Sequence, residues 1–187
     1  IALFFVSKIG GKMLGVSYGL ALADLVLAPA IPSATARGGG IMTPIMRSVA
    51  ETYDSRPGKT ARRAGAFLAI NVGQVNAITC AMFLTAMAGN PLIARLAGEE
   101  GVEITWGNWA LGAIVPGLCA LALVPYVVYR VYPPELKDTP EVVTMAKNEI
   151  RRMGPITPAE LMMGFTFVLL IFLWTVGDIV FGLNATS

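Results

Sequence analysis

The sequence contains no histidine, and few of its residues are charged. Without histidine the chain has no Ser-His or Cys-His catalytic pair, no HExxH zinc site and no histidine proton relay. Charged residues make up 14% of the sequence, against roughly 25% in ordinary soluble domains. The net charge of +2 gives no indication of nucleic acid as a partner. The two cysteines, Cys80 and Cys119, lie inside apolar segments, which is typical of small buried thiols.

Apolar residues, in contrast, make up 55% of the chain. Residues 64–94 and 109–129 contain no charged residue, and residues 161–183 contain only Asp178. A helix needs about 20 apolar residues to cross the ~30 Å hydrocarbon layer of a membrane. These segments predict an all-α integral membrane protein whose surroundings are the lipid bilayer.

The breaks between apolar segments give the expected order of elements. We expect an interfacial helix over 1–12, a re-entrant helical hairpin over 13–50, a broken transmembrane helix over 64–97, a transmembrane helix over 109–130, a cytoplasmic connector over 131–160 and a last transmembrane helix over 161–183. The chain begins at Ile1 without a signal sequence and stops directly after an apolar span. We therefore expect it to be an excerpt of a longer protein.

The stretch "LAPAIPSATARGGGIMTPI" interrupts the first apolar segment. Each flanking arm is too short to cross a membrane comfortably, so we expect a hairpin with its tip at 32–40. Irregular backbone at membrane depth survives only where protein or a water-filled cavity covers it. The tip offers the hydroxyls of Ser33 and Thr35, followed by Gly38 and two further glycines. A helix that begins at Ile41, with its N–H groups exposed, would complete an anion-binding arrangement.

The sequence "TAMAGNP" breaks the second long apolar segment at about 84–90. It offers Thr85, Asn90 and the backbone carbonyls around Gly89. Secondary transporters use such discontinuous helices, whose N-termini face anionic substrates and whose free carbonyls face cations. Two breaks of this kind indicate a transport site.

Several polar side chains in the apolar segments allow more than one interpretation. Arg37 either binds a substrate carboxylate, or snorkels or caps a helix. Asp24 is either functional or paired with a basic group outside this chain, because an unpaired charge in a membrane is costly. The amides of Asn71, Gln74 and Asn76 either line a pathway or hold helices together.

The charges of the loops predict an orientation in the membrane. Loops 51–63 and 130–160 are rich in lysine and arginine, whereas loop 98–108 has three glutamates and no basic residue. Cytoplasmic loops carry the excess of basic residues. We therefore expect loops 51–63 and 130–160 to be cytoplasmic and 98–108 to be external. As a separate expectation, the protein lies in a bacterial inner membrane.

The hairpin segment "ADLVLAPAIPSATARGGGIMTPIMRS" resembles the divalent anion:sodium symporter superfamily. The similarity is greatest to plastid 2-oxoglutarate/malate translocators and bacterial citrate/succinate or tartrate/succinate antiporters. It continues through "FLTAMAGNPLIARLA", "VPYVVYRVYPPELKDTPE", "ITPAELMMG" and "GLNATS", in this order. It extends over essentially the whole chain.

The resemblance assigns roles to residues of both breaks. In the family a Ser-Asn-Thr motif at the hairpin tip contacts a substrate carboxylate and helps form a sodium site. Ser33 and Thr35 match this motif, but Ala34 replaces the asparagine, which weakens substrate contact and fits the exchanger branch. Sodium is the only cofactor that the resemblance implies. The residues that match the family's cation site are Ser33, Thr85, Ala86, Gly89 and Asn90.

The family's fold consists of two inverted repeats, each with a hairpin and a broken helix, in a homodimer that moves substrate by an elevator-like shift. This chain would hold the later part of the first repeat and the first helix of the second. The second hairpin, which supplies the other half of the substrate site, would lie outside it.

We therefore expect a non-enzymatic function, the secondary active transport of di- or tricarboxylates such as 2-oxoglutarate, malate, succinate or citrate, by exchange. The residues expected to bind substrate are Ser33, Thr35, Arg37 and Gly38. One alternative is a structural or channel-like membrane module whose breaks are hinges; another is sodium-coupled transport of an inorganic divalent anion. A transporter predicts that Ser33, Thr35 and Asn90 converge in a solvated cavity. A structural module predicts that they lie apart, each bonded to local backbone.

Overall fold

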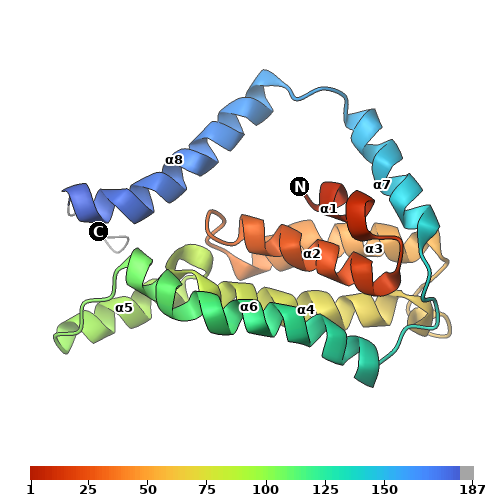
Figure 1. Cartoon of the computed structure of the whole chain (residues 1–187), viewed down its shortest axis with the longest axis horizontal. Coiled ribbons are helices and arrows are strands. Elements are labelled where there is room, and N and C mark those ends of the chain that lie inside the picture. The colour runs from red at the N-terminus through yellow and green to blue at the C-terminus, as the bar shows by residue number, and fades with distance from the viewer. Residues whose placement is uncertain (182–187) are drawn as a thin grey trace.

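The protein is described by a computed structural model, which covers residues 1–181 (Figure 1). The helices are α1 Ala2–Ile9, α2 Met13–Leu27, η1 Ala36–Met42, α3 Thr43–Thr52, η2 Ala61–Arg63, α4 Gly65–Met82, η3 Leu84–Ala86, α5 Gly89–Glu99, α6 Trp106–Val131, α7 Pro140–Met153 and α8 Pro158–Phe181. No β-strand occurs in residues 1–181, so the expected all-α fold is confirmed there. The end of the span expected at 161–183 lies outside the described residues.

Helices α1 and α2 form a tight antiparallel pair because glycine lies where they meet. A Cβ atom added at Gly19 would lie 3.2 Å from the backbone nitrogen of Val6, which leaves no room for a side chain without a shift. Val6, Met13 and Leu20 are buried in this contact. Close approach of the two backbones therefore depends on a residue without a side chain at position 19.

Helix α2, η1 and α3 make up the hairpin, and α4 packs across both of its arms (Figure 1). Apolar side chains of all these elements meet in one core, in which Met42, Val49, Phe67 and Leu68 are almost completely buried. Burial of such side chains contributes roughly 1.5–3 kcal/mol each. The hairpin is thus fixed on α4 by apolar packing along its length, as well as by the polar contacts described below.

The broken helix is interrupted after Met82. Phe83 has an extended backbone, η3 forms a single turn, and α5 begins at Gly89. The amide nitrogen of Asn90 donates to the carbonyl of Cys80 (2.8 Å), which has no helical donor because α4 ends at Met82. It also donates to the carbonyl of Phe83 (2.9 Å), which accepts a second hydrogen bond from the N–H of Ala86. One side chain thereby ties the end of α4 to the start of α5.

Helix α6 runs back along α4 and begins with a capping box, in which Thr105 and Asn108 bond each other's backbone N–H. A Cβ atom at Gly117 would lie 2.5 Å from Cγ of Met82, so glycine at this position allows α6 to lie close to α4. Within the described residues, α4 and α6 are the two single helices that are long and apolar enough to cross a membrane.

Helices α7 and α8 form an arm that is bent by 108° at residues 154–157 (Figure 1). Gly154 has φ +76°, a conformation that glycine adopts readily. α7 buries Val142 and Ala146 and packs on α1. In α8 most of the large apolar side chains up to residue 173 are exposed, and Phe167, Leu170 and Ile171 are half-buried. The apolar length of this bent pair lies in α8, whereas α7 carries Glu141, Arg151 and Arg152 and belongs to the expected cytoplasmic connector.

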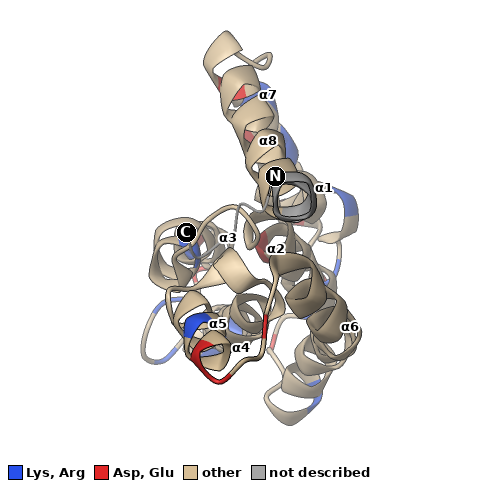
Figure 2. Cartoon of the chain, turned by 90° about the vertical axis from the view of Figure 1, so that its left-hand side faces the viewer, with Lys and Arg blue, Asp and Glu red and all other residues tan. Residues whose placement is uncertain are grey.

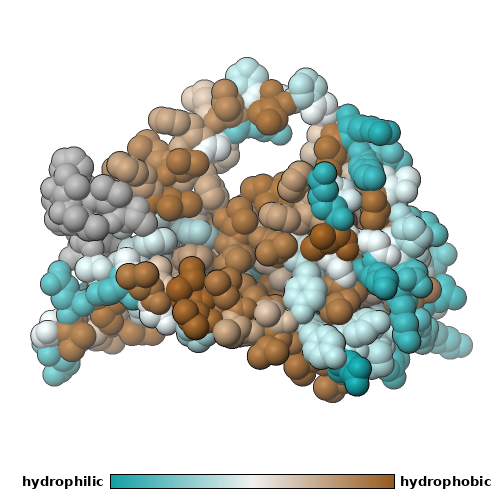
Figure 3. Space-filling view, viewed as in Figure 1, coloured by the Kyte–Doolittle hydropathy of each residue, from teal (hydrophilic) through white to brown (hydrophobic). Residues whose placement is uncertain are grey.

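The two ends of the helix bundle differ in charge. The backbone N–H groups of Glu135 and Leu136 bond the carbonyls of Arg62 and Arg63, so the two basic loops lie at the same end. The hairpin opens at this end, and the loop with Glu99, Glu100 and Glu103 lies at the opposite one (Figures 1 and 2). An apolar surface separates the two ends (Figure 3). The fold is consistent with the orientation predicted from the loop charges.

Candidate functional site

The hairpin tip is a turn followed directly by a helix. Ser33 lies at the start of this helix, where its Oγ accepts a hydrogen bond from the N–H of Ala36 (3.2 Å). The three glycines lie within the π-helix η1, and Thr43 Oγ1 donates to the carbonyl of Gly38 (2.8 Å). The expectation that the helix begins at Ile41 is therefore corrected. Ser33 caps a helix that starts several residues earlier, and the free N–H groups lie near Ser33.

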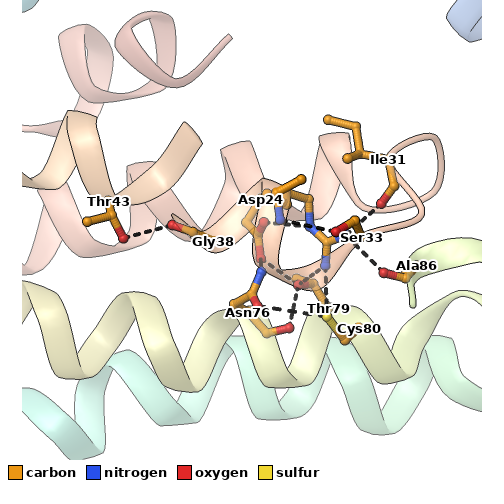
Figure 4. Close-up of polar contacts among 11 residues, drawn as sticks. Asp24, Ile31, Ser33, Gly38, Thr43, Asn76, Thr79, Cys80 and Ala86 are labelled. Atoms are coloured by element: carbon orange, nitrogen blue, oxygen red, sulfur yellow. Dashed lines mark hydrogen bonds and ion pairs between the residues drawn. The ribbon is translucent and has the colours of Figure 1, made fainter. Parts of the chain in front are cut away.

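A buried ion pair joins the two arms of the hairpin. Nε of Arg37, in η1, lies 2.8 Å from Oδ1 of Asp24, in α2, and the side chains are 0% and 1% exposed. The hydroxyl of Thr79, in α4, donates to the other carboxylate oxygen of Asp24. Asp24, Thr79 and Cys80 face one another between the hairpin and α4 (Figure 4). The partner of Asp24 thus lies within this chain, not outside it.

The rest of the Arg37 guanidinium is also fully bonded. Nη1 donates to the carbonyls of Ile31 (3.0 Å) and Ala86 (3.2 Å). Nη2 contacts Thr79 Oγ1 (3.3 Å) and Cys80 Sγ (3.0 Å). A guanidinium has five N–H donors, and each has a partner here. In this conformation Arg37 has no donor left for a substrate carboxylate; it links the hairpin tip to the break in the transmembrane helix.

The polar side chains of the second break bind other parts of the protein. The hydroxyl of Thr85 donates to the carbonyl of Pro29 (2.7 Å) and accepts a hydrogen bond from Nε1 of Trp106 (3.2 Å). Asn90 bonds the end of α4, and the carbonyl of Ala86 accepts from Arg37. Gly89 begins α5. These contacts leave a poor fit for a sodium ion, because the hydroxyl and carbonyl oxygens already have donors and a guanidinium lies beside one of them.

A groove of about 410 Å³ lies between α4 and the second arm of the hairpin. Its lining comprises Ala34, Thr35, Gly38, Gly39, Thr43, Met46, Ala69, Val72, Gly73 and Asn76. Thr35 and Gly38, two of the four residues expected to bind substrate, therefore share one wall. Ser33 precedes this wall as the helix cap, whereas the guanidinium of Arg37 lies in the buried ion pair.

The expected convergence of Ser33, Thr35 and Asn90 is not observed in this conformation. Ser33 and Asn90 bond local backbone, and Thr35 lines the groove. This pattern is nearer to the one expected for a structural module. Two breaks in the backbone are nevertheless brought together, since Thr85 bonds Pro29 and Arg37 bonds Ala86.

Three residues of the site were not singled out from the sequence for this role. Thr79 and Cys80 contact the guanidinium, and Trp106 is buried against Thr85. The spacing of Asn76, Thr79 and Cys80 places them on one face of α4 and could have indicated a polar stripe. Nothing in the sequence identifies the partner of that stripe.

Comparison with known proteins identifies the family. The profile described as "Sodium:sulfate symporter transmembrane region" matches residues 1–187. The Bacillus subtilis protein named "Putative malate transporter YflS" is 51% identical over 189 residues, which cover 100% of this chain and 39% of that protein. "Dicarboxylate transporter 1, chloroplastic" of Spinacia oleracea is 44% identical over 179 residues, 95% of this chain and 32% of the relative.

A third relative, "Inner membrane protein YbhI" of Escherichia coli, is 43% identical over 175 residues, 93% of this chain and 36% of that protein. The chain thus spans less than half the length of each of these relatives. The chain belongs to the sodium:sulfate symporter transmembrane-region family, and so to the divalent anion:sodium symporter superfamily.

Proposed function

We propose that this chain is part of a secondary active transporter of dicarboxylates, to which it contributes one hairpin and one broken helix. The observation that carries the proposal is the docking of the hairpin tip on the break of the transmembrane helix by buried hydrogen bonds and an ion pair. Irregular backbone at membrane depth requires such coverage. The names of the relatives indicate malate and dicarboxylates as the class of substrate.

Recognition of the anion involves no covalent chemistry. The helix that begins after Ser33 directs its free N–H groups and the positive end of its dipole toward the tip. Thr35 and Gly38 line the adjacent groove. We propose that a substrate carboxylate binds beside Ser33 and Thr35, with the remainder of the site supplied by parts of the protein outside this chain.

We propose exchange, not sodium coupling. Arg37 places a positive charge 3.2 Å from the Ala86 carbonyl, at the position expected for a cation. Its charge is balanced by the carboxylate of Asp24. Because this guanidinium occupies the place expected for a sodium ion, we expect the binding site to return across the membrane with a counter-substrate bound.

We propose a homodimer in a bacterial inner membrane, with the basic end of the bundle in the cytoplasm. The relative from E. coli carries "inner membrane" in its name. Movement of the hairpin together with α4 would carry the substrate, because polar contacts hold these elements together as one unit.

The test uses the full-length protein in proteoliposomes. Uptake of labelled malate or succinate is measured with and without internal dicarboxylate, and with sodium replaced by choline. We expect uptake that requires internal dicarboxylate and is unchanged by choline. Sodium-dependent uptake into empty vesicles would contradict exchange, and uptake of sulfate without any dicarboxylate uptake would contradict the class of substrate.

A further inference from the structure

The side-chain amide of Asn76 lies in the wall of the groove and is poorly satisfied. Its Nδ2 lies 3.4 Å from Oδ2 of Asp24, which is long for an N–H···O hydrogen bond. Its Oδ1 accepts only a weak contact from Cys80 Sγ at 3.9 Å. An amide nitrogen carries two N–H groups, so at least one has no partner among the described residues. The residue is half-buried and open to the groove.

Thr35 is the second polar side chain of this groove without a bond to protein. It is exposed, and its hydroxyl makes no hydrogen bond to the residues whose side chains are described. The other hydroxyl of the lining, that of Thr43, is used by the carbonyl of Gly38. All other side chains of the lining are apolar or absent. Two free donors, one from the hairpin and one from α4, therefore line the same groove.

We propose that the amide of Asn76 and the hydroxyl of Thr35 together bind one carboxylate group of the transported substrate. This inference rests on the proposed function and adds a residue of the broken helix to the substrate site. A carboxylate has two oxygens and accepts two donors, which matches the free groups of the groove. Binding would connect the hairpin to α4 through the substrate itself.

Neighbouring residues position the Asn76 amide. Asp24 draws the nitrogen of the amide toward itself, while the thiol of Cys80 faces the amide oxygen. A Cβ atom at Gly38 would lie 3.1 Å from the Asn76 side chain, so glycine there leaves the amide in place. The negative charge of Asp24 is balanced by Arg37 and does not repel an incoming carboxylate strongly.

The first test compares Asn76→Ala with Gln74→Ala in the full-length protein. Gln74 is an exposed amide on the same helix, and it does not line the groove. Loss of a hydrogen bond to a charged acceptor predicts a KM for succinate that is raised about tenfold in Asn76→Ala, with kcat within about twofold of wild type. Gln74→Ala should leave both constants unchanged.

A second measurement uses protection from a thiol reagent. Gly39 lines the groove and Gly40 does not, and a Cβ atom at either meets no atom within 4 Å. Each is replaced by cysteine in full-length protein that carries Cys119→Ser and from which every accessible cysteine outside this chain has also been removed, because Cys119 is exposed, whereas Cys80 is buried. Succinate should slow labelling of Gly39→Cys at least threefold and leave labelling of Gly40→Cys unchanged. Adding Asn76→Ala should raise the succinate concentration needed for protection about tenfold.

Each outcome decides between the two proposals. An unchanged KM in Asn76→Ala, or no protection of Gly39→Cys by succinate in a protein that transports it, overturns the role of Asn76 and leaves dicarboxylate transport standing. If Asn76→Ala fails to fold, protection of Gly39→Cys alone decides whether the groove holds substrate. Absence of dicarboxylate uptake by the wild-type protein overturns both proposals.

Discussion

The contact between the hairpin and α4 differs sharply from the outer surfaces of α6 and α8. At the contact, an aspartate and an arginine are almost fully buried, and their carboxylate and guanidinium groups have hydrogen-bond partners. On α6 and α8, large apolar side chains such as Val115 (66%) and Leu161 (68%) are exposed. Polar atoms are thus enclosed by protein, and apolar atoms face outward.

Backbone geometry explains this difference. The uninterrupted helix α6 satisfies its own backbone hydrogen bonds and can meet hydrocarbon with apolar side chains alone. The hairpin tip and the break after α4 leave carbonyls without helical partners, and Arg37, Thr85 and Asn90 bond four of them. Buried charge is therefore found where the helices are interrupted, which is also where a transporter needs polar groups.

The largest effect should follow from breaking the ion pair. Asp24→Ala or Arg37→Ala leaves one buried charge without its partner, and we expect a loss of about 3–5 kcal/mol in the free energy of unfolding. Val115→Ser, on the exposed face of α6, serves as the control and should change stability by less than about 0.5 kcal/mol in detergent. Denaturant unfolding of the purified full-length protein measures all three.

A double variant sharpens this prediction. Replacing both Asp24 and Arg37 by leucine and methionine removes the two charges together, so it should recover more than half of the stability lost by either single variant. Uptake should stay low, because the carbonyls of Ile31 and Ala86 lose their donor. Equal instability of the single and double variants would contradict the idea that charge pairing, not the shape of the side chains, holds this contact.

A smaller effect should follow from filling the space between η1 and α4. In Gly38→Ala the new Cβ would lie 3.1 Å from the amide of Asn76, which must shift by a small amount, and we expect a cost of about 1 kcal/mol, at the low end for overpacking. Gly39→Ala, one residue on, meets no atom within 4 Å and should be neutral or slightly stabilising. Thermal unfolding and succinate uptake of the two variants test the difference; similar behaviour of both would show that the two surfaces are not in close contact.

The smallest effect should be a dependence of protein stability on pH, which arises from a hydrogen bond at the basic end of the bundle. Tyr53 donates to Oε2 of Glu141 (2.7 Å), and this hydrogen bond lowers the pKa of Glu141 below its usual value of 4.5. The stabilisation is present above pH 4.5 and is lost as pH falls through the lowered pKa. Burial and the bond to Glu141 raise the pKa of Tyr53, so this contact also weakens once pH rises through that raised value.

The variant Glu141→Gln isolates the contribution of the ionised Glu141 carboxylate to protein stability. Between pH 6 and pH 3 the wild-type protein should lose slightly more thermal stability than Glu141→Gln, because the variant has no carboxylate to protonate. Because Glu141 is exposed, the difference should be close to the limit of measurement. A larger loss in the variant than in the wild type would contradict the assignment.

Much of the fold could be predicted from local sequence. Uncharged apolar runs predict α4 and α6, the Gly-Asn-Pro sequence predicts the interruption before α5, and the proline and glycine residues predict the turn of the hairpin. The start of the helix after the tip was predicted wrongly at Ile41. Three glycines in a row suggest a turn, whereas in the structure they lie within η1, with the Ser33 cap before them and a hydrogen bond from Thr43 to the carbonyl of Gly38.

The sequence by itself determined that this chain enters a membrane, where its helices break and which loops carry its charge, because these depend on composition along a continuous stretch. Only the tertiary structure decided what Arg37 does. Whether its guanidinium meets Asp24 or a substrate depends on the distance between two arms and α4, and 13 residues separate the pair in the chain. The same holds for Asn76, whose amide becomes a candidate ligand only because the hairpin places Thr35 in the same groove.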